Sequence, residues 1–393
     1  MLVIKGLPLE IPPDVELPPG LSLARQAAAH AIENSPTSSP LQKFDILLHF
    51  VNELLKSGSE STDSLLEENV CIVVINMAYY YQQVTERLIK KAYTEDSKEA
   101  WGNSGLYNKK SIGLLRYLID SGIANTTKYL GLVETFTKCW TLSQQLSIVM
   151  LSLSKLKSRI CGNNTGQESK KSSSNRYDRL LEFQESDLKD LATSSLLYAR
   201  LCIGCRDSCT ELTSTSVGAA CHPLTQYLDT LTFILLSLDR YKNDECGASI
   251  GMLEAATECL SHGLITSKQL KLIQESTKLK TKMALKLIEL KSESSNLRSK
   301  FKIFKKNDFA GKPELHPLLR STLEDFIMPL MMLLHYRYVK TNDKVFFQPI
   351  IRDREELVKG WPHGKTPDVT GTSWAFDGEQ LRELDTLGGS EYY

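Results

Sequence analysis

Apolar residues recur at helical spacing along most of the chain, most densely from Val70 to Val84. This run leaves no clean polar face, so it predicts a helix that is buried on most of its sides. The glutamines within it and the charges that flank it make it unsuited to a bilayer. Leucines at helical spacing over 106–118 predict a second helix, separated from the first by the polar stretch 90–105. The sequence therefore predicts a buried helical hairpin over residues 65–118.

The same periodicity predicts helices on both sides of this hairpin. They span residues 21–32, 41–55, 130–160, 180–212, 222–241, 248–260, 268–304 and 318–339, the last interrupted at Pro329. The 268–304 segment carries one apolar stripe opposite many lysines and glutamates, which is typical of a surface helix. Strand patterns occur only at 2–4 and 345–347. The predicted fold is therefore all-α, an elongated, solenoid-like body with at most one short β-hairpin.

The domain prediction is one body over residues 1–350, followed by an irregular C-terminal tail over 351–393. Residues 162–176 contain no large apolar side chain to bury, so this stretch is predicted to be a flexible surface insertion in that body. No stretch has the composition of a linker between two domains.

Charge and cysteine content narrow the class of protein. The 393 residues include 47 basic and 47 acidic side chains, so the net charge is zero and electrostatics does not favour nucleic acid or an anionic membrane as the main partner. Pro8 and Glu10 interrupt the N-terminal apolar stretch, which is not typical of a signal peptide. Nine cysteines, an odd number, lie mostly in apolar helical segments. They predict reduced thiols and a cytoplasmic protein.

Cys202, Cys205 and Cys209, followed by the Cys221-His222 pair, have a spacing that resembles zinc ligands. The first three cysteines are also i, i+3 and i+7, which is the spacing of one buried helical face, where cysteine is a common core residue. We favour the buried face and predict no metal site. A metal-binding regulator remains an alternative.

Catalytic motifs are not evident. The seven histidines (His30, His49, His222, His262, His316, His335 and His363) fall in no triad or metal motif, and no glycine-rich phosphate loop follows a predicted strand. The sequence therefore favours a protein without catalytic activity or cofactor.

Four stretches resemble one known family. Glu68–Tyr79, with Asn76 inside the apolar run, and Ser111–Leu118, with Gly113 and the Tyr117-Leu118 pair, resemble the central signature of the Bro-one domain. Tyr336–Ile350, with an Asn-Asp pair before an aromatic pair and a proline, resembles the end of that domain. Asn243–Ala256 is similar to a helix of the same family. The chain is identified as a member of the Bro-one family over about residues 1–350, most like the fungal PalC type.

The resemblance implies a banana-shaped helical scaffold. Bro-one domains bind the C-terminal amphipathic helix of the core ESCRT-III filament subunit, the Snf-seven or CHMP-four class, in a hydrophobic groove. A PalC-like protein would act in fungal ambient-pH signalling, where a transcription factor is activated by proteolysis. It would be cytoplasmic and recruited peripherally to endosomal or cortical membranes.

The resemblance also places the groove. The family's groove helix matches Leu197-Tyr198-Ala199-Arg200-Leu201, and a preceding helix matches Ser147–Leu151. Leu197 and Leu201 are i and i+4, so they share one helical face. We predict partner contacts at Leu197, Leu201, Ile148 and Met150, although core packing of the two leucines remains an alternative.

A second interpretation keeps the helical body and changes the partner. In it, the chain is a general helical-repeat adaptor unrelated to ESCRT-III, and the lysine-rich helix over 268–306 is its contact surface.

Overall fold

The structure of the chain is a computed structural model. It describes residues 1–2, 4, 6–12, 19–33, 38–58, 64–161, 183–266, 269–271 and 314–384. Apart from one antiparallel hairpin, β1 (Trp374–Phe376) and β2 (Leu381–Glu383), the regular structure of these residues is helical. The prediction of an all-α fold with at most one short hairpin is confirmed. No helix in this part of the chain is long and apolar enough to cross a membrane.

The chain forms two compact units. Unit 1 consists of Met1, Val3–Ile148 and Asp368–Tyr393, and unit 2 of Leu2 and Val149–Pro367. Within unit 1 the helices are α1 (Pro19–Glu33), α2 (Pro40–Gly58), α3 (Ser64–Glu95), α4 (Lys98–Asp120), the 3-10 turn η1 (Ile123–Thr126) and the first part of α5 (Leu130–Cys161). The rest of α5 belongs to unit 2.

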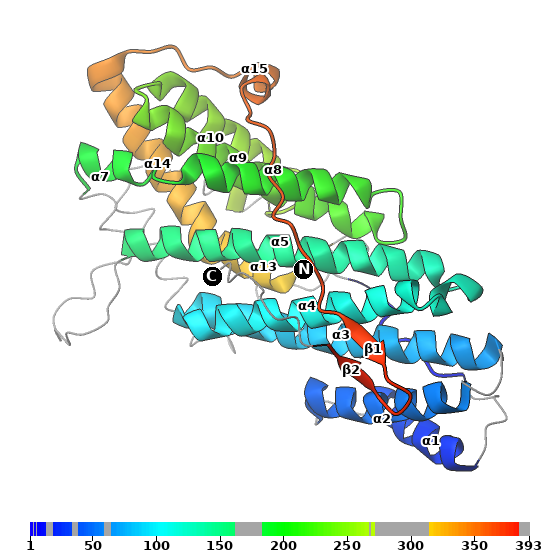
Figure 1. The fold of residues 1–393 in the computed structure, drawn as a ribbon. Helices are drawn as coiled ribbons and strands as arrows, with labels where there is room; N and C mark the ends of the chain where they lie inside the picture. The colour runs from blue at the N-terminus through cyan, green and yellow to red at the C-terminus, as the bar shows by residue number, and fades with distance from the viewer. Residues whose placement is uncertain are drawn as a thin grey trace, which may run out of the picture. The chain divides into compact units, whose positions relative to one another are not determined.

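The predicted hairpin is present as α3 and α4, which lie side by side (Figure 1). The Ser111 hydroxyl of α4 donates to the Ala78 carbonyl of α3 at 2.7 Å. The prediction that residues 90–105 separate the two helices is wrong, because both helices extend through that stretch and only a two-residue turn remains. Asp96 turns the chain at φ 54°, and the Ser97 side chain caps α4 by accepting from the Ala100 amide.

Unit 2 contains the remaining helices. They are α7 (Glu185–Asp190), α8 (Ser195–Glu211), α9 (Gly218–Lys242), α10 (Cys246–Ser261), α13 (Pro317–Thr322), the π-helical turn η3 (Leu323–Ile327), α14 (Met328–Thr341), the π-helical turn η4 (Asn342–Phe346) and α15 (Arg354–Lys359). Helix α9 packs against both α8 and α10 (Figure 1). Its residues 227–238 are all buried, so α9 forms the centre of this unit.

Several predicted elements differ from the structure. The helix predicted over 180–212 is divided into α7 and α8 by a turn that ends at Ser194, where φ is 69°. The strand predicted at 345–347 is wrong, because those residues belong to η4 and to Phe347, which has φ 53°. Leu2 and Ile4 lie in no strand. The 162–176 insertion and all of the 268–304 helix except 269–271 fall outside the described residues.

The C-terminal segment after η4 crosses several helices in an extended conformation. Its carbonyl oxygens lie so close to glycines of α10, α8 and α4 that a Cβ at any of them would overlap the backbone. The pairs are Gly247 with Pro349, Gly251 with Ile351, Gly204 with Lys365, and Gly113 with Thr372. The expected irregular tail over 351–393 therefore includes ordered structure, α15 and the hairpin, up to Glu383.

Candidate docking face on helix α8

Small side chains on one face of α8 allow it to pack closely against α9. Ala199, Cys202, Cys205 and Cys209 are each at most 1% exposed. The Cys209 thiol donates to the Cys221 carbonyl of α9 at 3.4 Å. The cysteine spacing in the sequence is thus the spacing of a helix core.

Cys202 and Cys205 behave as neutral core residues. Burial raises the pKa of the Cys202 thiol well above its ordinary value and that of Cys205 to about 12. Within the described residues, no group of three or more His, Cys, Asp or Glu side chains is arranged to hold a metal ion.

The first turn of α8 exposes two adjacent leucines. Leu196 is 44% exposed and Leu197 is 43% exposed. The turn that precedes them is held by Arg159 of α5, whose two terminal nitrogens both donate to the Thr193 carbonyl at 3.2 Å. Two large apolar side chains therefore face solvent. The helix that carries them is held at its N-terminus by Arg159 and packs against α9 on its opposite face.

The C-terminal segment covers the next turns of α8, and its crossing is visible in Figure 1. The Lys365 amide donates to the Arg200 carbonyl at 2.8 Å, and Arg200 Nε donates to the His363 carbonyl at 3.1 Å. Close approach of this segment requires glycine at position 204. On α8, the exposed apolar surface therefore lies at the first turn and ends near Leu197.

The structure gives the predicted contact residues different surroundings. Leu197 is exposed and Ile148 is half-buried, whereas Leu201 is 7% exposed and Met150 is fully buried. Leu197 and Leu201 share α8, and Ile148 and Met150 share α5. Leu197 in unit 2 and Ile148 in unit 1 each have accessible side-chain surface, whereas Leu201 and Met150 belong to the core.

Sequence reasoning missed two features of this face. Leu196 was not among the predicted contacts, although it is as exposed as Leu197. The covering segment over 363–366 was also missed. A signal for the second was present, because a glycine inside a helical pattern can have a packing reason, and Gly204 is such a residue.

Comparison with known proteins gives one family and one curated relative. The model of a family of unknown function, DUF5355, matches residues 64–393. The uncharacterized protein YGR122W of Saccharomyces cerevisiae is 30% identical over 384 residues, which cover 94% of this chain and 91% of the yeast protein.

A solved structure also aligns with the chain. It is titled as the structural basis for endosomal targeting by the Bro1 domain, and the alignment covers 90% of this chain and 83% of that one, at 11% identity and a TM-score of 0.39. At that identity and TM-score the alignment decides neither the partner nor the role of this chain.

Proposed function

The chain belongs to DUF5355, a family of unknown function, and we propose that it is a non-enzymatic adaptor that binds the C-terminal amphipathic helix of the core ESCRT-III subunit at α8. The partner, of the Snf-seven or CHMP-four class, is the one that the sequence resemblance to Bro-one domains implies. It would bind by helix-in-groove recognition, in which apolar side chains of an amphipathic helix lie on an apolar surface.

The observation that supports this proposal is the exposed Leu196-Leu197 pair. The opposite face of α8 is packed, so the two leucines are exposed without any rearrangement. This lowers the free-energy cost of ordering the surface when a partner binds. In the proposed complex Leu197 is the principal anchor. Leu201 lies one turn along the same helix, and Met150 of α5 is a further predicted contact. Ile148, half-buried on the part of α5 that belongs to unit 1, stays a separate predicted contact.

The cellular role in this proposal follows from the resemblance to the PalC type. The chain would link ESCRT-III to the proteins that activate a pH-responsive transcription factor in a fungus. It would be cytoplasmic and would reach endosomal or cortical membranes through its partner.

The test is the binding of the full chain to a fluorescent peptide of the ESCRT-III C-terminal helix. Leu197→Asp is expected to weaken binding at least tenfold, about 1.4 kcal/mol, because it places a charge on the apolar contact surface. Leu201→Asp is unsuitable for this purpose, since a carboxylate at this buried position would destabilise the fold.

The matched control is Leu106→Asp. Leu106 lies on α4 with 45% exposure, close to the 43% of Leu197, so its substitution adds the same charge elsewhere. Unchanged peptide binding by Leu106→Asp beside weakened binding by Leu197→Asp would support the proposal. Equal binding by both variants and the unaltered protein would refute the α8 site. Absence of binding by the unaltered protein would refute the ESCRT-III partner and favour a helical adaptor with another ligand.

A further inference from the structure

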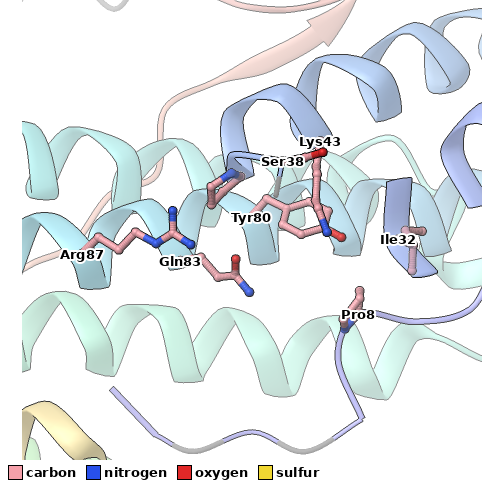
Figure 2. A pocket seen from close by; sticks show the side chains of 8 residues that line it. Pro8, Ile32, Ser38, Lys43, Tyr80, Gln83 and Arg87 are labelled. Carbon is pink, nitrogen blue, oxygen red and sulfur yellow. The ribbon is translucent and has the colours of Figure 1, made fainter. Parts of the chain in front are cut away.

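A small polar pocket lies in unit 1, where the N-terminal segment meets α1, α2 and α3 (Figure 2). Its volume is about 170 Å³, which is more than a single ordered water needs. The lining residues are Pro8, Ile32, Ser38, Pro40, Lys43, Tyr80, Gln83 and Arg87. Two of these side chains are cations, and none is acidic.

Lys43 is the unusual member of this lining. The residue is only 9% exposed, yet its ammonium forms no ion pair or hydrogen bond with any described residue. Its one contact of note is with the ring of Tyr80, whose centroid lies 5.5 Å from Nζ. Buried lysines are normally paired with an anion, because desolvation of an unpaired charge is costly.

A second buried polar group faces the same pocket. Tyr80 is 2% exposed, and its hydroxyl has no hydrogen-bond partner among the described residues. Burial raises the pKa of this hydroxyl to about 12, so at neutral pH it keeps its proton and can donate. Among the described residues neither this donor nor the Lys43 ammonium has an acceptor, and a bound anion would supply one.

The rest of the lining favours an anion too. Tyr80, Gln83 and Arg87 are i, i+3 and i+7 on α3, so they share a face, and Figure 2 shows their side chains around the pocket. Arg87 is exposed and has no ion pair with a described residue. Pro40, the first residue of α2, adds the positive end of a 19-residue helix.

We propose that this pocket binds the phosphate group of a phosphate monoester. Lys43 and Arg87 together supply two positive charges, which match a monoester that is mostly dianionic at neutral pH and exceed the single charge of a carboxylate. The Tyr80 hydroxyl and the Gln83 amide donate to the remaining phosphate oxygens. The site does not depend on the α8 face and stands if the ESCRT-III proposal fails.

The test is calorimetric titration of the full chain with inorganic phosphate and with phenyl phosphate, at constant ionic strength in chloride. Arg87→Gln and Tyr80→Phe are expected to weaken binding about three- to tenfold each, and Lys43→Gln more than tenfold. Arg87 is exposed, so its variant keeps the fold, and Tyr80→Phe removes only one oxygen. Lys90→Gln removes an exposed cation of α3 that is not in the lining, and it is the matched control.

The source of the phosphate is tested with vesicles. One set contains phosphatidylcholine with phosphatidic acid, whose headgroup is a phosphate monoester, and the other contains phosphatidylcholine with phosphatidylserine. Phenyl phosphate binding that depends on Arg87 and Tyr80 supports a soluble ligand. Co-sedimentation only with phosphatidic acid, and lost in the same variants, supports a lipid headgroup. No binding in either assay, or binding that Arg87→Gln and Tyr80→Phe leave unchanged, overturns the site.

Discussion

Glycines on three helices allow the C-terminal segment to lie directly on the helix backbone. At Gly113 of α4, a Cβ would overlap the Thr372 carbonyl and also lie 2.9 Å from the Trp374 side chain. The Thr372 amide donates to the Lys109 carbonyl at 3.1 Å, one turn earlier on the same helix. Glycine is therefore needed at position 113 for close packing, because its missing side chain leaves room for another part of the backbone.

Gly113→Ala is expected to destabilise unit 1 by about 1–3 kcal/mol, the usual cost of forcing extra volume into a packed site. This is the opposite of the usual effect of alanine in a helix, which is stabilising by about 0.5–1 kcal/mol relative to glycine. Chemical denaturation of the full chain, followed by tryptophan fluorescence, would measure the change.

Gly102→Ala is the control on the same helix. Nothing lies within 4 Å of a Cβ built at Gly102, so this substitution is expected to stabilise α4 by roughly 0.5–1 kcal/mol. Stabilisation by both substitutions would show that the segment does not lie on Gly113.

At the residue scale, the sequence predicted which residues share a helical face better than it predicted whether each residue is buried. The i, i+4 spacing correctly placed Leu197 and Leu201 on one helical face. It could not show that one is exposed and the other buried, because burial depends on distant residues such as Lys365, which crosses the next turn. The resemblance to Bro-one domains drew attention to Gly113. Glycine is needed there because Thr372 lies against it, and the periodicity of the sequence cannot predict that contact.

At the element scale, apolar periodicity located most helices. The predicted and observed elements differ where tertiary contacts hold a polar or irregular stretch of backbone. The polar stretch 90–105 is helical except for the turn at residues 96 and 97, since the buried residues that it contains, such as Trp101 and Ser104, occupy one face. The π-helical turn η4 was taken for a strand because Val345, Phe346 and Phe347 have high strand propensity. Val345 is 64% exposed and Phe347 is 74% exposed, so neither pairs in a sheet core.

The side-chain amide of Asn342 positions the backbone after η4 through two hydrogen bonds. Asn342 is 6% exposed; its side-chain nitrogen donates to the Gln348 carbonyl at 2.9 Å, and its side-chain oxygen accepts from the Gln348 amide at 3.1 Å. Gln348 in turn accepts from the Gly247 amide of α10 at 3.0 Å. The Asn-Asp pair that the sequence offered as part of a family signature thus positions the start of the C-terminal segment.

Asn342→Ala is expected to destabilise unit 2 by about 1–3 kcal/mol, because it leaves both backbone groups of Gln348 without their partner. Hydrogen exchange of residues 342–351, measured by mass spectrometry, should increase more than exchange in the centre of α9.

Asp343→Ala is the matched control for this substitution. Asp343 is the exposed neighbour of Asn342 in the same turn, and its replacement is expected to change stability by less than about 0.5 kcal/mol. Equal exchange in the two variants would contradict the role assigned to the Asn342 amide.

At the scale of the whole molecule, the chain forms most of unit 1, then unit 2, and returns to unit 1 at Asp368. Unit 1 is therefore not a continuous piece of sequence, whereas unit 2 is continuous apart from Leu2. In unit 1 the returning residues bury Val369 and Leu381, and the Leu381 amide donates to the Asn52 side chain of α2 at 2.7 Å. This return could not be predicted from composition, because residues 351–393 are rich in polar residues and have weak periodicity.

Ending the chain after Pro367 is therefore expected to weaken unit 1 and leave unit 2 largely intact. The truncated chain loses the burial of two apolar side chains, each contributing about 1.5–3 kcal/mol, and the ion pair between Lys110 and Glu383 at 2.8 Å. Hydrogen exchange should increase in α2 and α4, which contact the hairpin, while α9 and α10 keep their protection. A chain ended after Leu384 keeps all of these contacts and is the control. Loss of protection in α9 equal to that in α4 would show that the two units do not unfold separately.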